Sequence, residues 1–250
     1  MRFRDRVLAG EILFGLFLDL DSPASAELAG RAGYDWLIVD LEHGTATETS
    51  LLAHLYAIQG TGAAALVRPQ SGERMRIGRA LDLGAAGIMV PRLDSAAEAR
   101  EAVTFLRYPP DGIRGVATRT RGAGLGSRPH AEIRSVNDLI LGIVQIESRG
   151  GLRDATEIAA IDGVDVLFVG PADLSHSLGV PGRFDDPAYQ AALDAVVAAC
   201  RASGKAAGIL VYDTAAVPGY IERGFTFVGI GADGAFVADA VARALSAVRS

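Results

Sequence analysis

The stretch WLIVDLEH, residues 36–43, runs from four apolar residues directly into Asp40, Glu42 and His43. A strand that is apolar on both faces is typical of a parallel sheet covered by helices on each side. Charged side chains at the end of such a strand are costly unless they are paired or bind a ligand. The stretch therefore predicts a buried parallel strand that ends at a functional site.

Seven further short apolar runs follow the same pattern. They are GLFLDL (15–20), AALVRP (64–69), AGIMVP (86–91), GIVQIE (142–147), VLFVGPAD (166–173), AGILVYD (207–213) and FTFVGIGAD (225–233). Helical patterns lie between or after them, at 25–33, 95–107, 186–205 and 235–249. Alternating strands and helices in a single domain over residues 1–250 predict a (β/α)8 barrel, a TIM barrel. An open doubly wound sheet is the alternative, but its G-x-G-x-x-G fingerprint does not follow the first strand.

Composition narrows the class of protein. The formal net charge of −6 and the pI of about 5.3 disfavour nucleic acid as a partner. The single cysteine, Cys200, lies in an Ala-rich helical pattern and is expected to be a buried apolar residue. No apolar run reaches the length of a membrane span, and no signal-peptide core follows the basic N-terminus. We expect a soluble cytoplasmic protein.

One connection is unusually long. About fifty residues separate the apolar runs at 86–91 and 142–147, and a helix accounts for only the first half. The second half is rich in glycine and contains five arginines. These are Arg114, Arg119, Arg121, Arg128 and Arg134. We expect a loop that is either a solvated surface segment, a cover over the site or a subunit contact.

Polar residues follow most of the predicted strands. In a parallel barrel the carboxyl ends of all strands open on one face, where active sites are built. The residues that fall there are Asp40, Glu42, His43, Arg68, Arg92, Gln145, Glu147, Asp173 and Asp233, together with the turn Gly170-Pro171-Ala172. Their concentration at one end predicts one shared site.

Glu147 and Asp173 are the strongest metal candidates. They follow consecutive predicted strands, and neighbouring strands lie about 4.8 Å apart. Two carboxylates with open positions suit a hard divalent cation such as Mg²⁺ or Mn²⁺. Each carboxylate taken alone is also compatible with a helix cap or a surface ion pair.

Asp40 precedes His43 by three residues. A carboxylate on one ring nitrogen would fix the tautomer of His43 and leave the other nitrogen free to take a proton. Arg68 follows an apolar run, where an anionic substrate or a developing oxyanion would compensate its charge. His54, His130 and His176 are weaker candidates. The whole set predicts enolate chemistry on a small keto acid.

The same residues carry a resemblance to a known family. The sequence resembles the HpcH/HpaI aldolases of the phosphoenolpyruvate/pyruvate barrel superfamily, which are class II, metal-dependent enzymes acting on pyruvate-type enolates. The matching pieces span most of the chain in order, and GPADLS and RYPPDGIRG are the most specific. They are YDWLIVDLEHG (34–44), LVRP (66–69), LDLGAAGIMVPRLDSAAEAREAV (81–103), RYPPDGIRGV (107–116), VQIES (144–148), GVDVLFVGPADLSHSLG (163–179) and GKAAGIL (204–210).

The resemblance implies a reaction and a site. The reaction is reversible cleavage of a 4-hydroxy-2-oxo acid to pyruvate and an aldehyde, with Mg²⁺, Mn²⁺ or Co²⁺ held by Glu147 and Asp173. His43, paired with Asp40, would act as base through a metal-bound water, and Arg68 would stabilise the enolate. Gln145, Leu210 and the backbone of Gly170, Pro171 and Ala172 would contact the substrate, and Asp82 would lie near the site or a subunit boundary.

The resemblance also implies an assembly. It implies a homohexamer built as a trimer of dimers, with the C-terminal helix exchanged between subunits. The segment 118–130 departs most from the family pattern and is expected to influence the choice of aldehyde.

Three alternatives stay open at this point. A malyl-CoA or citramalyl-CoA lyase would use the same metal enolate site, and Arg114 to Arg134 would then supply a groove for the CoA phosphates. A keto-acid decarboxylase would share the enolate. A non-catalytic barrel with a relict site is the third possibility.

Overall fold

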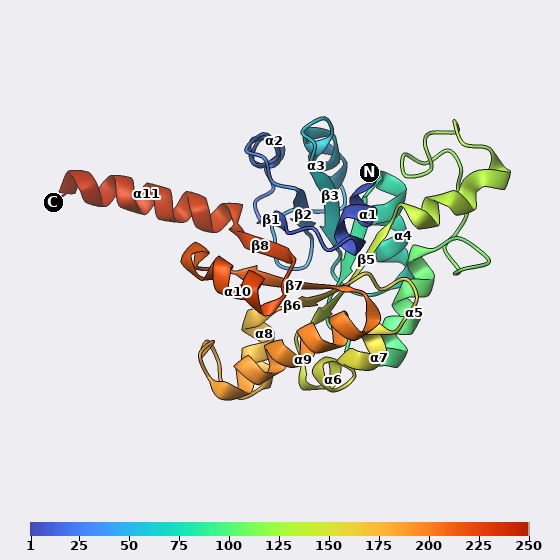
Figure 1. Ribbon diagram of the computed structural model, residues 1–250. Coiled ribbons are helices and arrows are strands. Elements are labelled where there is room, and N and C mark those ends of the chain that lie inside the picture. The colour runs from blue at the N-terminus through green and yellow to red at the C-terminus, as the bar shows by residue number, and fades with distance from the viewer. Residues whose placement is uncertain (250) are drawn as a thin grey trace.

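The computed structural model describes residues 1–249, whose strands form one closed parallel barrel (Figure 1). Each strand pairs with the next along the chain, and the last pairs with the first. Within the described chain the strands are β1 (Leu13–Leu18), β2 (Trp36–Asp40), β3 (Ala64–Arg68), β4 (Gly87–Val90), β5 (Leu141–Ile146), β6 (Val166–Val169), β7 (Ala206–Val211) and β8 (Phe227–Ala232). The predicted TIM barrel is confirmed, and each of the eight apolar runs overlaps one of its strands, although β1, β5 and β7 begin one or two residues before their runs.

Helices connect the strands and surround the barrel (Figure 1). They are α1 (Phe3–Leu8), α2 (Pro23–Arg31), α3 (Leu51–Ile58), α4 (Arg74–Leu83), α5 (Ala96–Leu106), α6 (Arg149–Arg153), α7 (Ala155–Ala159), α8 (Pro171–Ser177), α9 (Pro187–Ser203), α10 (Val217–Arg223) and α11 (Asp233–Arg249), with short 3-10 helices η1 (His130–Asp138) and η2 (Thr214–Ala216). The four helices expected from sequence correspond to α2, α5, α9 and α11.

Large aromatic side chains fill the barrel interior. Trp36 stacks on Phe227 at 4.4 Å between ring centroids, and Phe168 meets both rings edge-on. Gly15 makes room for this packing, because a Cβ there would lie 1.9 Å from the Trp36 ring. The interior is therefore a solid core, and the space for a ligand lies at the strand ends.

The amino end of the barrel is closed by α1. Val7 joins the interior cluster, and Phe3 packs edge-on against Phe227. Arg4 donates two hydrogen bonds to the buried carboxylate of Asp165, at 2.8 and 2.9 Å. Apolar packing by α1 and a buried ion pair therefore give the amino end of the barrel a structural role.

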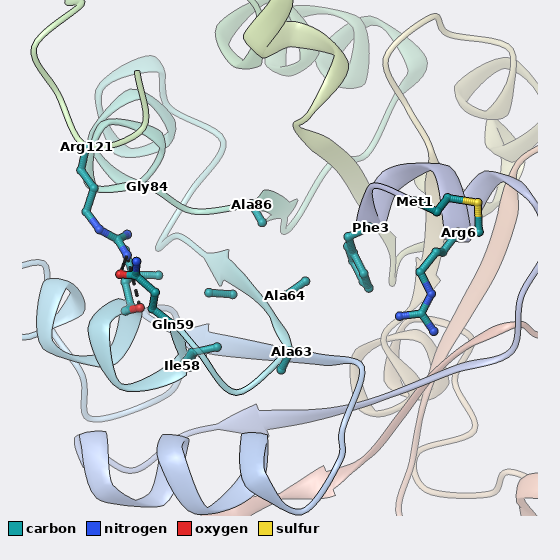
Figure 2. Close-up of a pocket in the computed structure, with 13 residues that line it drawn as sticks. Met1, Phe3, Arg6, Ile58, Gln59, Ala63, Ala64, Gly84, Ala86 and Arg121 are labelled. Carbon is teal, nitrogen blue, oxygen red and sulfur yellow. Dashed lines mark hydrogen bonds between the residues drawn. The ribbon is translucent and has the colours of Figure 1, made fainter. Parts of the chain in front are cut away.

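The long segment after α5 lies at the amino end of the barrel and not over the carboxyl end. Arg121 donates to the Leu83 carbonyl oxygen at 3.0 Å and to Gln59 Oε1 at 2.9 Å, where α4 and α3 end. Figure 2 shows Arg121 beside Gln59 in a cavity of about 370 Å³ that also reaches Phe3. Of the three alternatives left open for this segment, a cover over the site of its own chain is therefore wrong, because Arg121 binds helix ends on the opposite side.

The final helix, α11, extends away from the barrel (Figure 1). Its apolar residues are exposed, with 41 to 81 % of their surface accessible. They are Phe236, Val237, Val241, Leu245 and Val248. A helix of an isolated soluble chain normally turns such residues toward a core. Among residues 1–249, no helix is long and apolar enough to cross a membrane.

Candidate active site

The register of β2 and β3 builds the first part of the site. Asp40 and Arg68 are partners across the two strands, each at its carboxyl end. Arg68 therefore donates a two-fold hydrogen bond to Asp40, Nε to Oδ1 at 2.9 Å and Nη2 to Oδ2 at 2.6 Å. Both residues are buried, and a bidentate pair fixes the guanidinium plane. Sequence analysis placed Asp40 and Arg68 at one rim correctly, but not their pairing.

His43 does not pair with Asp40 through its ring, contrary to the sequence-based expectation. The Asp40 carboxylate accepts from the backbone N–H groups of Glu42 and His43, at 3.0 and 3.3 Å, and otherwise serves Arg68. The carboxylate nearest the imidazole is Glu42, with Oε1 at 3.8 Å from His43 Nε2. The Asp40 side chain instead holds the turn that presents His43, whose own side chain is 60 % exposed.

Glu42, which the sequence analysis assigned only to the rim, lies between Arg68 and His43. Its side chain is only 7 % exposed, and its Oε2 lies 3.3 Å from Arg68 Nη1. Burial raises the pKa of the Glu42 carboxyl, while the charge of Arg68 opposes that rise. Glu42 therefore links the buried arginine to the exposed histidine.

Glu147 follows β5 and is held by two donors. Its Oε1 accepts from the backbone N–H of Arg92 at 2.6 Å, and its Oε2 accepts from Gln145 Nε2 at 3.0 Å. Burial raises the pKa of Glu147 to about 7, and the nearby carboxylates of Glu42 and Asp173 add to the rise. A carboxylate kept in an unfavourable charged state gains most from a bound cation.

Gly170, at the end of β6, lets the chain approach Glu147 closely. A Cβ at this position would lie 2.8 Å from Glu147 Oε2. Asp173 follows three residues later in the first turn of α8. The glycine therefore sets the spacing between the backbone of the Gly-Pro-Ala turn and the Glu147 carboxylate.

A pocket of about 290 Å³ opens at this rim. Every residue that lines it has a polar or charged side chain. They are Glu42, His43, Arg92, Asp94, Glu147, Ser148, Asp173 and Ser177. In residues 1–249 no group of three or more His, Cys, Asp and Glu side chains gathers as a metal site does. The chain thus offers the two carboxylates Glu147 and Asp173, which fit a hard divalent cation that takes its other ligands from small molecules.

The carboxyl rim holds a second carboxylate pair, separate from this pocket. Asp233 Oδ1 accepts from the backbone N–H groups of Asp19 and Leu20, and its Oδ2 accepts from the Ser25 hydroxyl at 2.6 Å. Asp19 Oδ1 accepts from the Gly234 N–H at 2.9 Å. The expected single cluster of rim residues is therefore wrong for Asp233, which serves the junction of β1, β8 and α11.

The remaining candidates lie outside the pocket. Leu210 packs against the interior apolar cluster. His54 is buried in α3 with Nδ1 3.1 Å from the Ser50 carbonyl oxygen, and His130 contacts Thr118. Burial raises the pKa of the Cys200 thiol to about 12, as expected for a buried apolar residue.

The arginine-rich segment does not form a groove beside the pocket. Arg114 donates to Asp82 at 3.0 Å and lies over the Tyr108 ring, while Arg134 pairs with Asp111. The groove for CoA phosphates that the sequence allowed is thus not built at the mouth of this chain's site.

Several pocket residues were not predicted from the sequence. Arg92 was noted at a strand end but given no role, and Asp94, Ser148 and Ser177 were not singled out. The sequence signal for these residues was weak, because each falls two to eight residues beyond the end of a strand, in a loop or, for Ser177, in α8. Only their position after apolar runs pointed to this rim.

Comparisons with known proteins agree with this geometry. Residues 13–240 match the family described as HpcH/HpaI aldolase/citrate lyase. A hydroxypyruvate/pyruvate aldolase of Agrobacterium fabrum is 40 % identical over 98 % of this chain and 92 % of its own. A 4-hydroxy-2-oxo-heptane-1,7-dioate aldolase of Salmonella arizonae is 40 % identical over 92 % of this chain and 88 % of its own. The crystal structure of an HpcH/HpaI aldolase/citrate lyase family protein from Burkholderia cenocepacia superposes with a TM-score of 0.93, at 38 % identity, over 99 % of this chain and 98 % of that one.

Proposed function

Because this chain belongs to the HpcH/HpaI aldolase/citrate lyase family, and is therefore a carbon–carbon lyase, we propose that it is a divalent-metal-dependent pyruvate aldolase. It reversibly cleaves a 4-hydroxy-2-oxo acid to pyruvate and an aldehyde. The observation that carries this proposal is the polar pocket, which is lined by the two carboxylates Glu147 and Asp173 and by His43. Glu42 of the same lining lies 3.3 Å from the buried Arg68.

Glu147 and Asp173 would hold the metal, which we propose to be Mg²⁺, Mn²⁺ or Co²⁺. The raised pKa of Glu147 supports this, since burial without a cation disfavours its charged form. When bound, the metal supplies a Lewis acid that stabilises negative charge on the oxygens of the 2-oxo acid. Gln145 and the Arg92 backbone orient the Glu147 carboxylate.

Arg68 stabilises the developing enolate. Its guanidinium is locked by Asp40 and Glu42, so its orientation does not have to change during the reaction. The turn Gly170-Pro171-Ala172, at the start of α8, binds the substrate carboxylate through the backbone N–H of Ala172. Pro171 has no N–H, and the Gly170 N–H donates to the Ile146 carbonyl oxygen at 3.3 Å. We propose that Leu210 contacts the substrate from the side of the barrel interior, where it packs against the apolar cluster.

His43 moves the proton. In cleavage, the 4-hydroxyl proton leaves toward His43, the C3–C4 bond breaks, and its electron pair forms the pyruvate enolate. A proton then adds to C3 and releases pyruvate. Glu42 places a carboxylate oxygen 3.8 Å from His43 Nε2, beside the ring that receives the 4-hydroxyl proton.

The names of the relatives suggest the range of substrates. One relative at 40 % identity is named for hydroxypyruvate and pyruvate, and the other for a seven-carbon dioate. We propose that this chain takes a small 2-oxo acid as donor and an aldehyde as acceptor.

We propose further that the chain assembles as a homohexamer, a trimer of dimers, and exchanges α11 between subunits. The exposed apolar residues of α11 support this, because a neighbouring copy would cover them. Val241→Glu with Leu245→Glu is expected to reduce the mass measured by analytical ultracentrifugation. An unchanged hexamer would refute helix exchange, and a monomeric wild type would refute the assembly.

The function is tested by following pyruvate release from 4-hydroxy-2-oxo acids with Mg²⁺, Mn²⁺ or Co²⁺ and then with EDTA. We expect metal-dependent cleavage that EDTA abolishes. Cleavage that persists in metal-free protein, or none with any of these metals, would refute the proposal.

A further inference from the structure

The pocket contains more acidic than basic side chains. Glu42, Asp94, Glu147 and Asp173 line it, while Arg92 is its one arginine in the described part of the chain. The two carboxylates Glu147 and Asp173 are accounted for by the proposed metal. The proposed metal does not account for the positive charge of Arg92.

The two arginines of this rim differ in how their guanidinium groups are bound. Arg68 is buried and held by Asp40 and Glu42. Arg92 is exposed, and within residues 1–249 its guanidinium makes no hydrogen bond or ion pair, although its charge acts on Glu42. Arg92 therefore keeps its fork of donors available for a ligand.

The backbone of Arg92 is constrained to this position. Its φ of 57° lies in the left-handed region, which costs a non-glycine residue on the order of 1–2 kcal/mol. The same conformation brings its N–H to within 2.6 Å of Glu147 Oε1. One residue thus orients a proposed metal ligand through its backbone and also lines the same pocket, where its charge acts on Glu42.

We propose that Arg92 selects the acceptor, and that the preferred aldehyde carries an anionic group, a carboxylate or a phosphate, which binds the Arg92 guanidinium. This inference rests on the proposed aldolase function. Arg68 and the Gly170–Ala172 backbone are assigned to the pyruvate half, so an acid group bound by Arg92 belongs to the other half of the substrate. A planar fork matches both carboxylate and phosphate oxygens.

The test compares matched aldehydes in condensation with pyruvate. Butanal and 4-oxobutanoate differ by one carboxylate, and glyceraldehyde and glyceraldehyde 3-phosphate by one phosphate. In the wild type we expect kcat/KM to favour one anionic member over its neutral match by roughly 10- to 100-fold, mainly through KM. Arg92→Gln should abolish that ratio and Arg92→Lys should retain part of it. Arg100→Gln, at an exposed position on α5, is the matched control and should keep the wild-type ratio.

The outcomes separate the two proposals. If Arg92→Gln lowers kcat/KM equally for neutral and anionic aldehydes, Arg92 only balances the charge of the carboxylates. That result would overturn this inference but not the proposed aldolase function. A wild type without preference for either anion overturns it as well. A wild type that neither condenses any of the four aldehydes nor exchanges the methyl protons of pyruvate overturns the aldolase proposal, and this inference with it.

Discussion

Two pairs of carboxylates stand at the carboxyl rim of the barrel, and they differ in what they bind. Asp19 and Asp233, at the ends of β1 and β8, accept hydrogen bonds from backbone N–H groups and from Ser25. Glu147 has only two donors, and the side chain of Asp173 accepts no hydrogen bond within the described residues. The first pair accepts five hydrogen bonds from its own chain, four of them at Asp233. The second pair accepts two and has acceptor capacity left for a ligand.

Clustering of carboxylates therefore does not by itself identify a metal site. Both pairs follow strand ends and both contain a carboxyl whose pKa is raised, Asp19 to about 6 and Glu147 to about 7. What separates them is the count of donors and the presence of a pocket, which opens beside Glu147 and Asp173. The following substitutions test whether this difference is functional.

The largest difference in Mn²⁺ affinity and in aldol cleavage is expected between Glu147→Gln and Asp233→Asn. Loss of a direct ligand should weaken Mn²⁺ binding by at least about 100-fold and abolish aldol cleavage, because only one carboxylate remains. Asp233→Asn should leave Mn²⁺ affinity unchanged and cost about 1–2 kcal/mol of unfolding free energy, from weakened hydrogen bonds. Calorimetric titration and urea unfolding measure both. Equal losses of affinity in the two variants would contradict the distinction.

Arg68→Lys tests the arginine beside the functional pair. Lysine keeps the charge but loses the fork bound to Asp40, so we expect aldol cleavage to fall by about 10²–10³-fold with near-normal Mn²⁺ affinity. Arg68→Ala should in addition lower the free energy of unfolding by about 3–5 kcal/mol, because Asp40 and Glu42 stay buried. Near-wild-type turnover in Arg68→Lys would exclude the assigned role.

Gly170→Ala probes the close approach to Glu147. The added methyl group would lie 2.8 Å from Oε2 and must displace the carboxylate or the backbone. We expect Mn²⁺ affinity to fall by about 10- to 100-fold. Gly219→Ala is the control, since a Cβ on that α10 residue meets no atom within 4 Å. If both variants bind Mn²⁺ like the wild type, the spacing at Gly170 is not needed.

The smallest effect concerns pH and the structural pair. Burial, with the neighbouring Asp233, raises the folded-state pKa of Asp19 to about 6, above the ordinary value of 3.8. Ionisation of Asp19 therefore costs stability, and the loss develops as pH rises from about 4 through 6. The Tm of Asp19→Asn minus the Tm of the wild type should therefore be larger at pH 8 than at pH 5. A Tm difference independent of pH would show that Asp19 does not titrate in this range.

Sequence patterns predicted the barrel well because buried parallel strands are continuous apolar runs. They also placed Glu147, Asp173, Arg68 and His43 at one rim, since strand ends share a face. The pairing of side chains was harder to predict from the sequence. Asp40 binds Arg68 and not the His43 ring because strand register, which no local pattern encodes, puts the two opposite each other.

Functional roles beyond the strands depended on loop geometry. Arg92 enters the pocket through a left-handed backbone conformation that its residue type does not predict. For the arginine-rich segment the sequence left three interpretations open, one of them a cover over the site, but the segment packs at the amino end because its partners are helix ends such as Gln59. Long-range packing decided both positions.

Exchange of the methyl protons of pyruvate in D₂O, followed by NMR, tests the central claim most directly, since it needs no aldehyde. With Mg²⁺ present, we expect exchange by the wild type and by Asp233→Asn, and none by Glu147→Gln or after EDTA. Exchange that survives in Glu147→Gln, or its loss in a folded Asp233→Asn protein, would contradict the assignment of function to the Glu147–Asp173 pair.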